Sequence, residues 1–204
     1  MAVATTTCSS CGANGAPSKF VDGVPDYSVS AMDEQAEQLH AWQDRLAGFD
    51  TEGWTVAQRI DWELVRAEMN GLDFDLRVRR PWAKDPAFYV SIYSAQSDVP
   101  AHEGTVVHGW VDLWLYDDAL ANGDTGDLAA RIGAIPELLA QARINLADSN
   151  ARDLWMAGLR SFRGQAADLA AFAGRVEGMS SELDAAIAAA RTATDEFHDW
   201  IEAE

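Results

Sequence analysis

The stretch LDAAIAAARTATDEFHDWI, Leu183 to Ile201, carries the clearest structural signal in the chain. Its apolar positions recur at alternating steps of four and three residues, and each residue of an α-helix turns the chain by about 100°. They therefore share one face of a helix, which needs a neighbour to cover it. The positions on this face are Leu183, Ile187, Ala190, Thr194, Phe197 and Ile201.

Two stretches before it carry the same kind of stripe. Short polar connections near residues 148–150 and 177–181 join the three stretches, which predicts antiparallel neighbours in an up-and-down array. Pro136 interrupts the first stripe without shifting its phase, so it either kinks one helix or lies in the first turn of a new one. The first stripe is Leu128, Ile132, Ile135, Leu139, Ala142 and Leu146, and the second is Trp155, Leu159, Phe162, Ala166, Leu169, Ala173 and Val176.

Two more helices are predicted nearer the N-terminus. Ser30 is the expected cap of the first, whose stripe of Leu39, Trp42, Leu46 and Phe49 ends near Gly48. The second begins at a capping box made by Thr55 and Gln58 and stops before Pro81. Its apolar residues cover more than one stripe, so we expect it to lie between two neighbours. They are Ile60, Trp62, Leu64, Val65, Met69, Leu72 and Leu76.

The segment from Arg80 to Asn122 is the least regular. Its proline-rich first half predicts short turns around a brief helix near Ala87 to Ser94. The β-branched run GTVVHGWV could be a strand, but a single strand would lack a partner, so a helix is predicted from about Val106. The predicted fold is all-α, an antiparallel array of long amphipathic helices with one irregular connection rich in proline and aromatic residues.

Composition excludes some functions. The 15 Lys and Arg against 33 Asp and Glu give a formal net charge of -18, which repels phosphate backbones and anionic lipid. Nucleic acid is therefore not an expected partner. No run approaches the ~20 apolar residues of a membrane span, and the N-terminus lacks a signal peptide. These features favour a cytoplasmic location.

Residues 1–28 are predicted to be a flexible tail, with the helical domain at 29–204. The tail holds Cys8 and Cys11 as a lone C-x-x-C, without the second pair of a zinc ribbon or the strand and helix of a thioredoxin-like motif. We interpret them as solvent-exposed thiols without a metal.

The stretch HEGTVVH, His102 to His108, resembles part of a zinc peptidase motif. In H-E-x-x-H the histidines are four apart and share one helix face. Here they are six apart, which leaves them about 120° apart around a helix axis. No metal ligand or catalytic residue is predicted in this chain. A small metalloenzyme built on His102, Glu103 and His108 is therefore the least favoured functional hypothesis.

The irregular connection also holds the candidate binding residues. Trp82, Tyr89 and Tyr93 could face a peptide or aromatic group, with Arg80 meeting a carboxylate. The alternative, which we favour, is that Trp82 and Tyr89 hold the connection onto the helices.

Five segments carry a resemblance to a known family. RRPWAKDPAFYVS, SDVPAHEG, RIGAIPELLAQARINL, DLWMAGLRSF and AAIAAARTATDEFHDWIE resemble, in that order and at similar spacing, the N-terminal half of the DUF885 family of bacterial proteins. The resemblance covers about Gln35 to Glu202. Its most specific part is Ala134 to Leu146.

This resemblance implies a largely helical, zinc metallopeptidase-like protein. The family's H-E-x-x-H helix and downstream Glu ligand belong to its C-terminal half, so zinc is expected only there, and a peptide substrate would bind with that half. The chain ends in mid-helix at Glu204 without a capping glycine, which suggests a truncated fold. The expected function is a non-catalytic scaffold and part of a substrate cleft. The alternative is a self-standing helical module that binds a protein or a ligand.

Overall fold

The computed structural model describes residues 20–21, 24–95, 111–149 and 151–204. Seven α-helices, α1 to α7, account for most of these residues, and the strands in this part of the chain have two residues each. The predicted all-α fold is confirmed. The chain divides into two compact units, one of residues Ser28–Pro81 and one that joins the residues up to Tyr27 to Trp82–Glu204.

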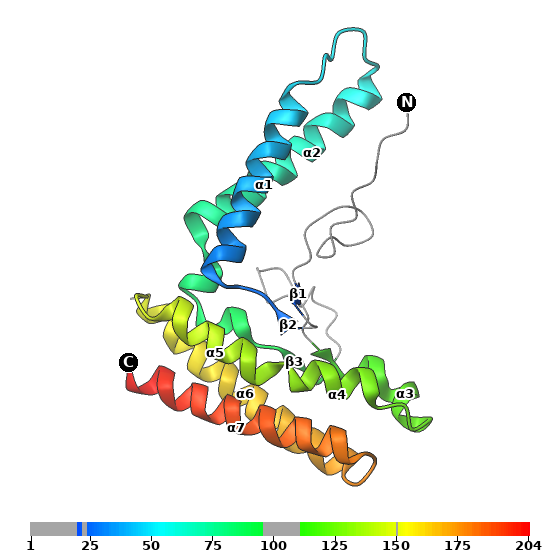
Figure 1. Ribbon diagram of the computed structural model, residues 1–204, viewed down its shortest axis with the longest axis vertical. Coiled ribbons are helices and arrows are strands. Elements are labelled where there is room, and N and C mark those ends of the chain that lie inside the picture. The colour runs from blue at the N-terminus through cyan, green and yellow to red at the C-terminus, as the bar shows by residue number, and fades with distance from the viewer. Residues whose placement is uncertain (1–19, 22–23, 96–110, 150) are drawn as a thin grey trace. The chain divides into compact units, whose positions relative to one another are not determined.

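The larger unit is built on a helical array (Figure 1). It contains α4 (Gly126–Gly133), α5 (Ile135–Leu146), α6 (Arg152–Val176) and α7 (Ser181–Ala203), and α7 contacts the other three. Successive long helices run antiparallel, as the short connections predicted. Every member of the first and third stripes is buried. These two stripes form a large part of the core of this unit.

Pro136 lies in the first turn of α5, where a proline loses no helical hydrogen bond. The first stripe is therefore split between α4 and α5, which confirms the second of the two alternatives for this proline. The stripe keeps its phase across the break, so both helices bury the same face against α7.

The helix predicted from Val106 is wrong where the structure can test it. Val111–Asp112 form strand β4, which pairs in parallel with β3 (Ile92–Tyr93), and a 3-10 turn η4 (Leu113–Tyr116) leads into the short α3 (Asp117–Ala121). A strand partner does exist, because β3 lies in the proline-rich first half of the same irregular segment. Residues 106–110 lie outside the described part of the chain.

The brief helix predicted near Ala87 to Ser94 is confirmed only at its start and as a 3-10 helix, because beyond Tyr89 the connection is not helical. It forms two 3-10 turns, η2 (Pro81–Ala83) and η3 (Pro86–Tyr89), and then β3. Asp85 caps η3 by accepting from the Ala87 N–H at 2.9 Å. Within the predicted tail, β1 (Phe20–Val21) and β2 (Val24–Pro25) form an antiparallel pair.

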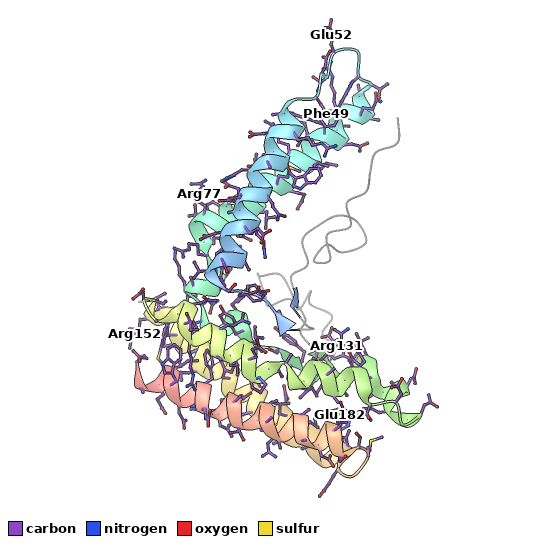
Figure 2. All side chains as sticks on the ribbon, viewed as in Figure 1. Phe49, Glu52, Arg77, Arg131, Arg152 and Glu182 are labelled. Carbon is purple, nitrogen blue, oxygen red and sulfur yellow. The ribbon has the colours of Figure 1, made fainter. Side chains whose placement is uncertain are left out.

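The smaller unit is a helical hairpin of α1 (Val29–Ala47) and α2 (Val56–Phe74), continued by a π-helical turn η1 (Asp75–Arg79). Phe49 and Glu52 lie in the turn between the two helices (Figure 2). The capping box of Thr55 and Gln58 is present as predicted. The cap of α1 is Ser28 and not Ser30, because the Ser28 Oγ accepts from the Ala31 N–H at 3.3 Å.

Helix α2 packs against α1, but none of its residues is buried. The expectation that α2 lies between two neighbours is therefore wrong for the part of the chain that the structure describes. No described helix is both long enough and apolar enough to cross a membrane.

Candidate functional site

The irregular connection lies against α5 and α6 through its η3 turn. The approach to α6 is close at Gly158, because a Cβ on this residue would come within 2.7 Å of the Pro86 Cβ. Three of the four candidate site residues, Trp82, Tyr89 and Tyr93, lie in the part of this segment that belongs to the larger unit.

Tyr89 is fully buried and connects two parts of the unit. Its hydroxyl donates to the Trp82 carbonyl at 2.7 Å and accepts from the Asn145 Nδ2 of α5 at 2.9 Å. The same Asn145 amide donates to the Tyr27 carbonyl at 2.8 Å. Burial raises the pKa of Tyr89, so its phenol stays protonated and able to donate.

A second buried contact was not predicted. Gln165 of α6 is 2% exposed, and its Oε1 accepts from the Ser91 N–H at 2.7 Å and the Ile92 N–H at 3.2 Å. Its Nε2 donates to the Thr194 Oγ1 of α7 at 3.1 Å. One amide thus joins the connection to two helices. A signal was available, since Gln165 is three residues after Phe162 and four before Leu169, on the buried side of the helix.

Trp82 is 8% exposed, so it and Tyr89 lie in the core of the larger unit. Tyr93 is half-buried in β3 opposite Asp112, and burial, with the negative charge of Asp112, raises its pKa. Arg80 is exposed and belongs to the smaller unit, where it has a left-handed φ of 47° and its N–H donates to the Asp75 carbonyl at 2.8 Å. The structure brings Trp82 and Tyr89 into direct contact. That any of the four residues meets a substrate stays a prediction.

A pocket of about 370 Å³ lies where α6 begins and α7 ends. Trp155, Met156 and Ile201 supply apolar walls, and Arg152 and Glu202 supply charge. Arg152 is labelled at this end of α6 in Figure 2. The Trp155 indole N–H donates to the Ser149 Oγ at 3.1 Å, and its ring lies 5.3 Å from that of Trp200. The lining is mixed, because Ser149, Arg152, Glu202 and Glu204 lie beside the apolar side chains.

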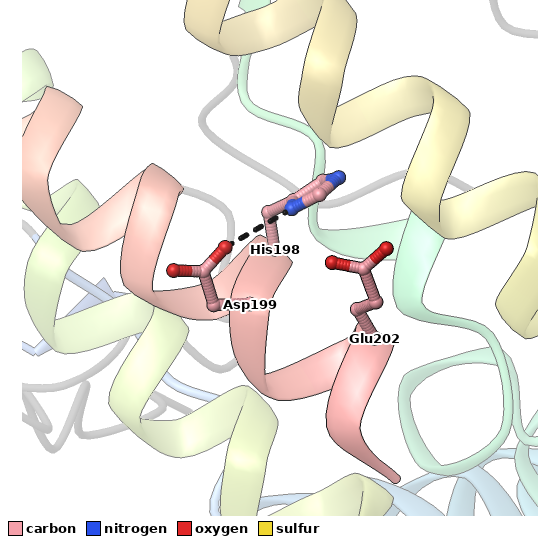
Figure 3. A group of neighbouring side chains, drawn as sticks. All are labelled: His198, Asp199 and Glu202. Atoms are coloured by element: carbon pink, nitrogen blue, oxygen red, sulfur yellow. Dashed lines mark hydrogen bonds and ion pairs between the residues drawn. The ribbon is translucent and has the colours of Figure 1, made fainter.

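A cluster of three possible metal-ligating side chains lies on α7 near this pocket. His198, Asp199 and Glu202 each offer a ligand atom within 4.8 Å of the others (Figure 3). The His198 Nδ1 lies 3.4 Å from the Asp199 Oδ1, whereas the His198 Nε2 is buried without a hydrogen-bond partner among the described residues. One imidazole and two carboxylates suit a divalent cation. However, Asp199 and Glu202 are both exposed, an arrangement that is common on acidic surfaces.

Several residues weighed in the sequence lie outside the described part of the chain. They are Cys8, Cys11, His102, Glu103 and His108.

Comparisons with known proteins identify a family and a similar fold. A family model described as "Bacterial protein of unknown function (DUF885)" matches residues 9–204. No curated protein is detectably similar to the chain. A solved structure from Shewanella oneidensis, described as "a putative lipoprotein of unknown function", is similar in fold with a TM-score of 0.62 and 16% sequence identity. The match covers 91% of this chain and 33% of that one, so the chain spans about a third of that structure's length.

Proposed function

The chain belongs to the DUF885 family, and from this membership we propose that it is the non-catalytic helical region of a larger zinc-dependent peptidase or related hydrolase. In this role it would provide a scaffold and one wall of the substrate cleft.

The observation that supports a scaffold is the way in which the irregular connection is held. Asn145 of α5 and Gln165 of α6 bind it through buried hydrogen bonds, and Thr194 of α7 completes the second contact. Residues that shape a binding site must be positioned by rigid elements and by hydrogen bonds behind them. The connection has this support, and its less buried end at Tyr93 and Ser94 would supply the cleft wall.

In this proposal, the hydrolase chemistry belongs to a further part of the protein, outside the residues of this chain. The resemblance to DUF885 proteins implies an H-E-x-x-H helix there, and a zinc ion held on it would activate water. The residues of this chain would then orient the substrate. The relative from Shewanella oneidensis has room for such a region, since two thirds of its chain lie outside the match.

Two measurements test the non-catalytic role. Purified without a His tag and supplied with Zn²⁺, the chain should retain well under one zinc per molecule and should not hydrolyse a mixed peptide library. The His198→Ala variant is the matched control, because His198 belongs to the cluster of cation-binding character on α7. Stoichiometric zinc or turnover that this variant loses would overturn the proposal. Sequencing the DNA after codon 204 would show whether an H-E-x-x-H frame continues from it.

The alternative is a self-standing ligand-binding module, which the pocket beside Trp155 favours. A thermal-shift screen of small acids and peptides tests it. Met156→Arg would fill the pocket, and Met179→Arg is the control because both methionines are 44% exposed. A ligand that stabilises wild type and Met179→Arg, but not Met156→Arg, would support the module. Equal shifts in all three proteins would argue against it.

A further inference from the structure

Helix α2 carries a second apolar stripe that the described residues leave uncovered. Its large members are Val56 (76% exposed), Ile60 (53%), Leu64 (60%) and Phe74 (49%). With Ala67 and Gly71 between them, the positions follow at steps of four, four, three, four and three. This spacing places all six on one side of the helix. We call this side the outer face of α2.

The outer face is distinct from the side that packs on α1. The Trp62 indole N–H donates to the Leu46 carbonyl at 3.0 Å, and the Gln43 Nε2 of α1 donates to the Met69 carbonyl at 3.4 Å. At about 100° per residue, Trp62 and Met69 lie about half a turn from the outer face. Helix α1 therefore occupies the opposite side.

The C-terminal half of the outer face suits the close approach of a second helix. Ala67 and Gly71 are the small residues of the stripe, and a Cβ on Gly71 would meet nothing within 4 Å. Small residues on such a face allow the backbone of another helix to approach closely, and the larger residues at both ends interdigitate with its side chains. Steps of three and four residues keep the stripe on one side of the helix, where another element could cover it.

The charges beside the outer face are asymmetric. On one flank, Glu63 forms an ion pair with Arg66. On the other flank, Asp61 and Glu68 are exposed, and neither forms an ion pair within the part of the chain that the structure describes. A helix that carries Lys or Arg toward this flank would gain complementary charge.

We propose that the outer face of α2 docks an amphipathic helix with basic residues on one flank, supplied by the part of the DUF885 fold outside this chain. This inference rests on the proposed scaffold function. The similar structure from Shewanella oneidensis provides the length for such a helix, since the match covers only 33% of it. A second copy of the chain is a poorer occupant, because each copy carries a formal net charge of -18 and has the same acidic flank.

Binding to the full chain can be measured with two synthetic helices that share one stripe of Leu and Ala. One helix carries Lys on the flank and the other carries Glu. We expect the Lys helix to bind about tenfold more tightly than the Glu helix, with the difference falling as salt rises. Leu64→Glu should weaken binding of the Lys helix by about tenfold or more. Ile144→Glu is the control, because Ile144 is 73% exposed on α5 of the other unit.

Equal affinity for the two helices, no binding, or the same loss in both variants would overturn the docking surface. Light scattering of the free chain tests whether a second copy covers the outer face of α2. A dimer that Leu64→Glu converts to a monomer would make a second copy the occupant. In a longer DUF885 protein, a photo-crosslinking residue at the position aligned with Leu64 should react with a segment outside the matched region. A crosslink within that region would overturn the assignment. None of these readouts depends on zinc or turnover, so the docking surface and the scaffold function can fail separately.

Discussion

Gly158 of α6 lies directly beneath Pro86 of the irregular connection, so close that a Cβ at residue 158 would come within 2.7 Å of the proline Cβ. The contact is rigid on both sides, because one partner is helix backbone and the other is a proline ring. It explains a glycine in the interior of a long helix, where glycine normally costs stability.

Gly158→Ala should therefore destabilise the chain by about 1 to 3 kcal/mol, since one added methyl group overpacks the contact. Gly164→Ala and Gly174→Ala are matched controls in the same helix, because a Cβ at either position meets nothing within 4 Å. Each control should gain about 0.5 to 1 kcal/mol from better helix propensity. Urea denaturation followed by circular dichroism measures all three variants, and a stabilised Gly158→Ala would contradict the close contact between Gly158 and Pro86.

Gln165→Leu should cost about 2 to 4 kcal/mol of unfolding free energy, because the Ser91 and Ile92 N–H groups lose their acceptor while remaining buried. Thr194→Val removes the other partner of the amide. A double-mutant cycle of these substitutions measures the coupling between α6 and α7. Strictly additive effects would show that Gln165 and Thr194 act independently.

Tyr89→Phe should cost about 1 to 2 kcal/mol near neutral pH, because the Trp82 carbonyl and the Asn145 amide lose their shared hydroxyl. Tyr116→Phe is the control, since the Tyr116 hydroxyl donates to Asp127 in an exposed hydrogen bond at 2.9 Å. Its effect should stay within about 0.5 kcal/mol.

The advantage of wild type over Tyr89→Phe should also depend on pH. Burial raises the pKa of Tyr89 in the folded chain, so folding favours the protonated phenol. The contribution is complete below the unfolded-state pKa of about 10 and is lost as pH rises above it, by up to about 1.4 kcal/mol per pH unit. Unfolding free energies of both proteins from pH 8 to about pH 11 test this window. A difference that does not shrink above pH 10 would contradict the effect of burial.

Trp82→Ala tests whether this residue is a core or a binding residue. Trp82 is 8% exposed, so Trp82→Ala should lower the free energy of unfolding by about 3 to 5 kcal/mol. Trp42 is 46% exposed, so Trp42→Ala should lower it by only about 1 kcal/mol. Thermal melts of the two variants provide the comparison. A small loss for Trp82→Ala would return this residue to the list of candidate substrate contacts.

Helices with one clear apolar stripe were predictable from local spacing. The third stripe is buried at every position, and Pro136 begins a helix as one of the two alternatives allowed. The box of Thr55 and Gln58 could be recognised because both partners lie within one turn. The cap of α1 was misplaced by two residues, because Ser28 and Ser30 offer the same chemistry and only backbone geometry distinguishes them.

Features that join distant residues could not be predicted in this way. Strand β4 was taken for helix because its partner, Ile92–Tyr93, precedes it by nearly twenty positions and has no strand signal of its own. Tyr89 and Trp82 were weighed as substrate contacts or as a structural lock, and spacing alone could not separate the two alternatives. Their burial depends on Asn145 of α5 and on helices that come later in the chain.

Local patterns were enough to predict the helical class, the main helices and the family, because periodicity, capping and segment order are properties of residues that are close in the chain. Only the tertiary structure showed that Gln165 of α6 binds both α7 and the irregular connection, and that the outer face of α2 is uncovered among the described residues. The physical reason is that burial and hydrogen-bond partners depend on which elements meet in space. An apolar stripe shows that a neighbour is needed, but it does not specify which segment supplies it.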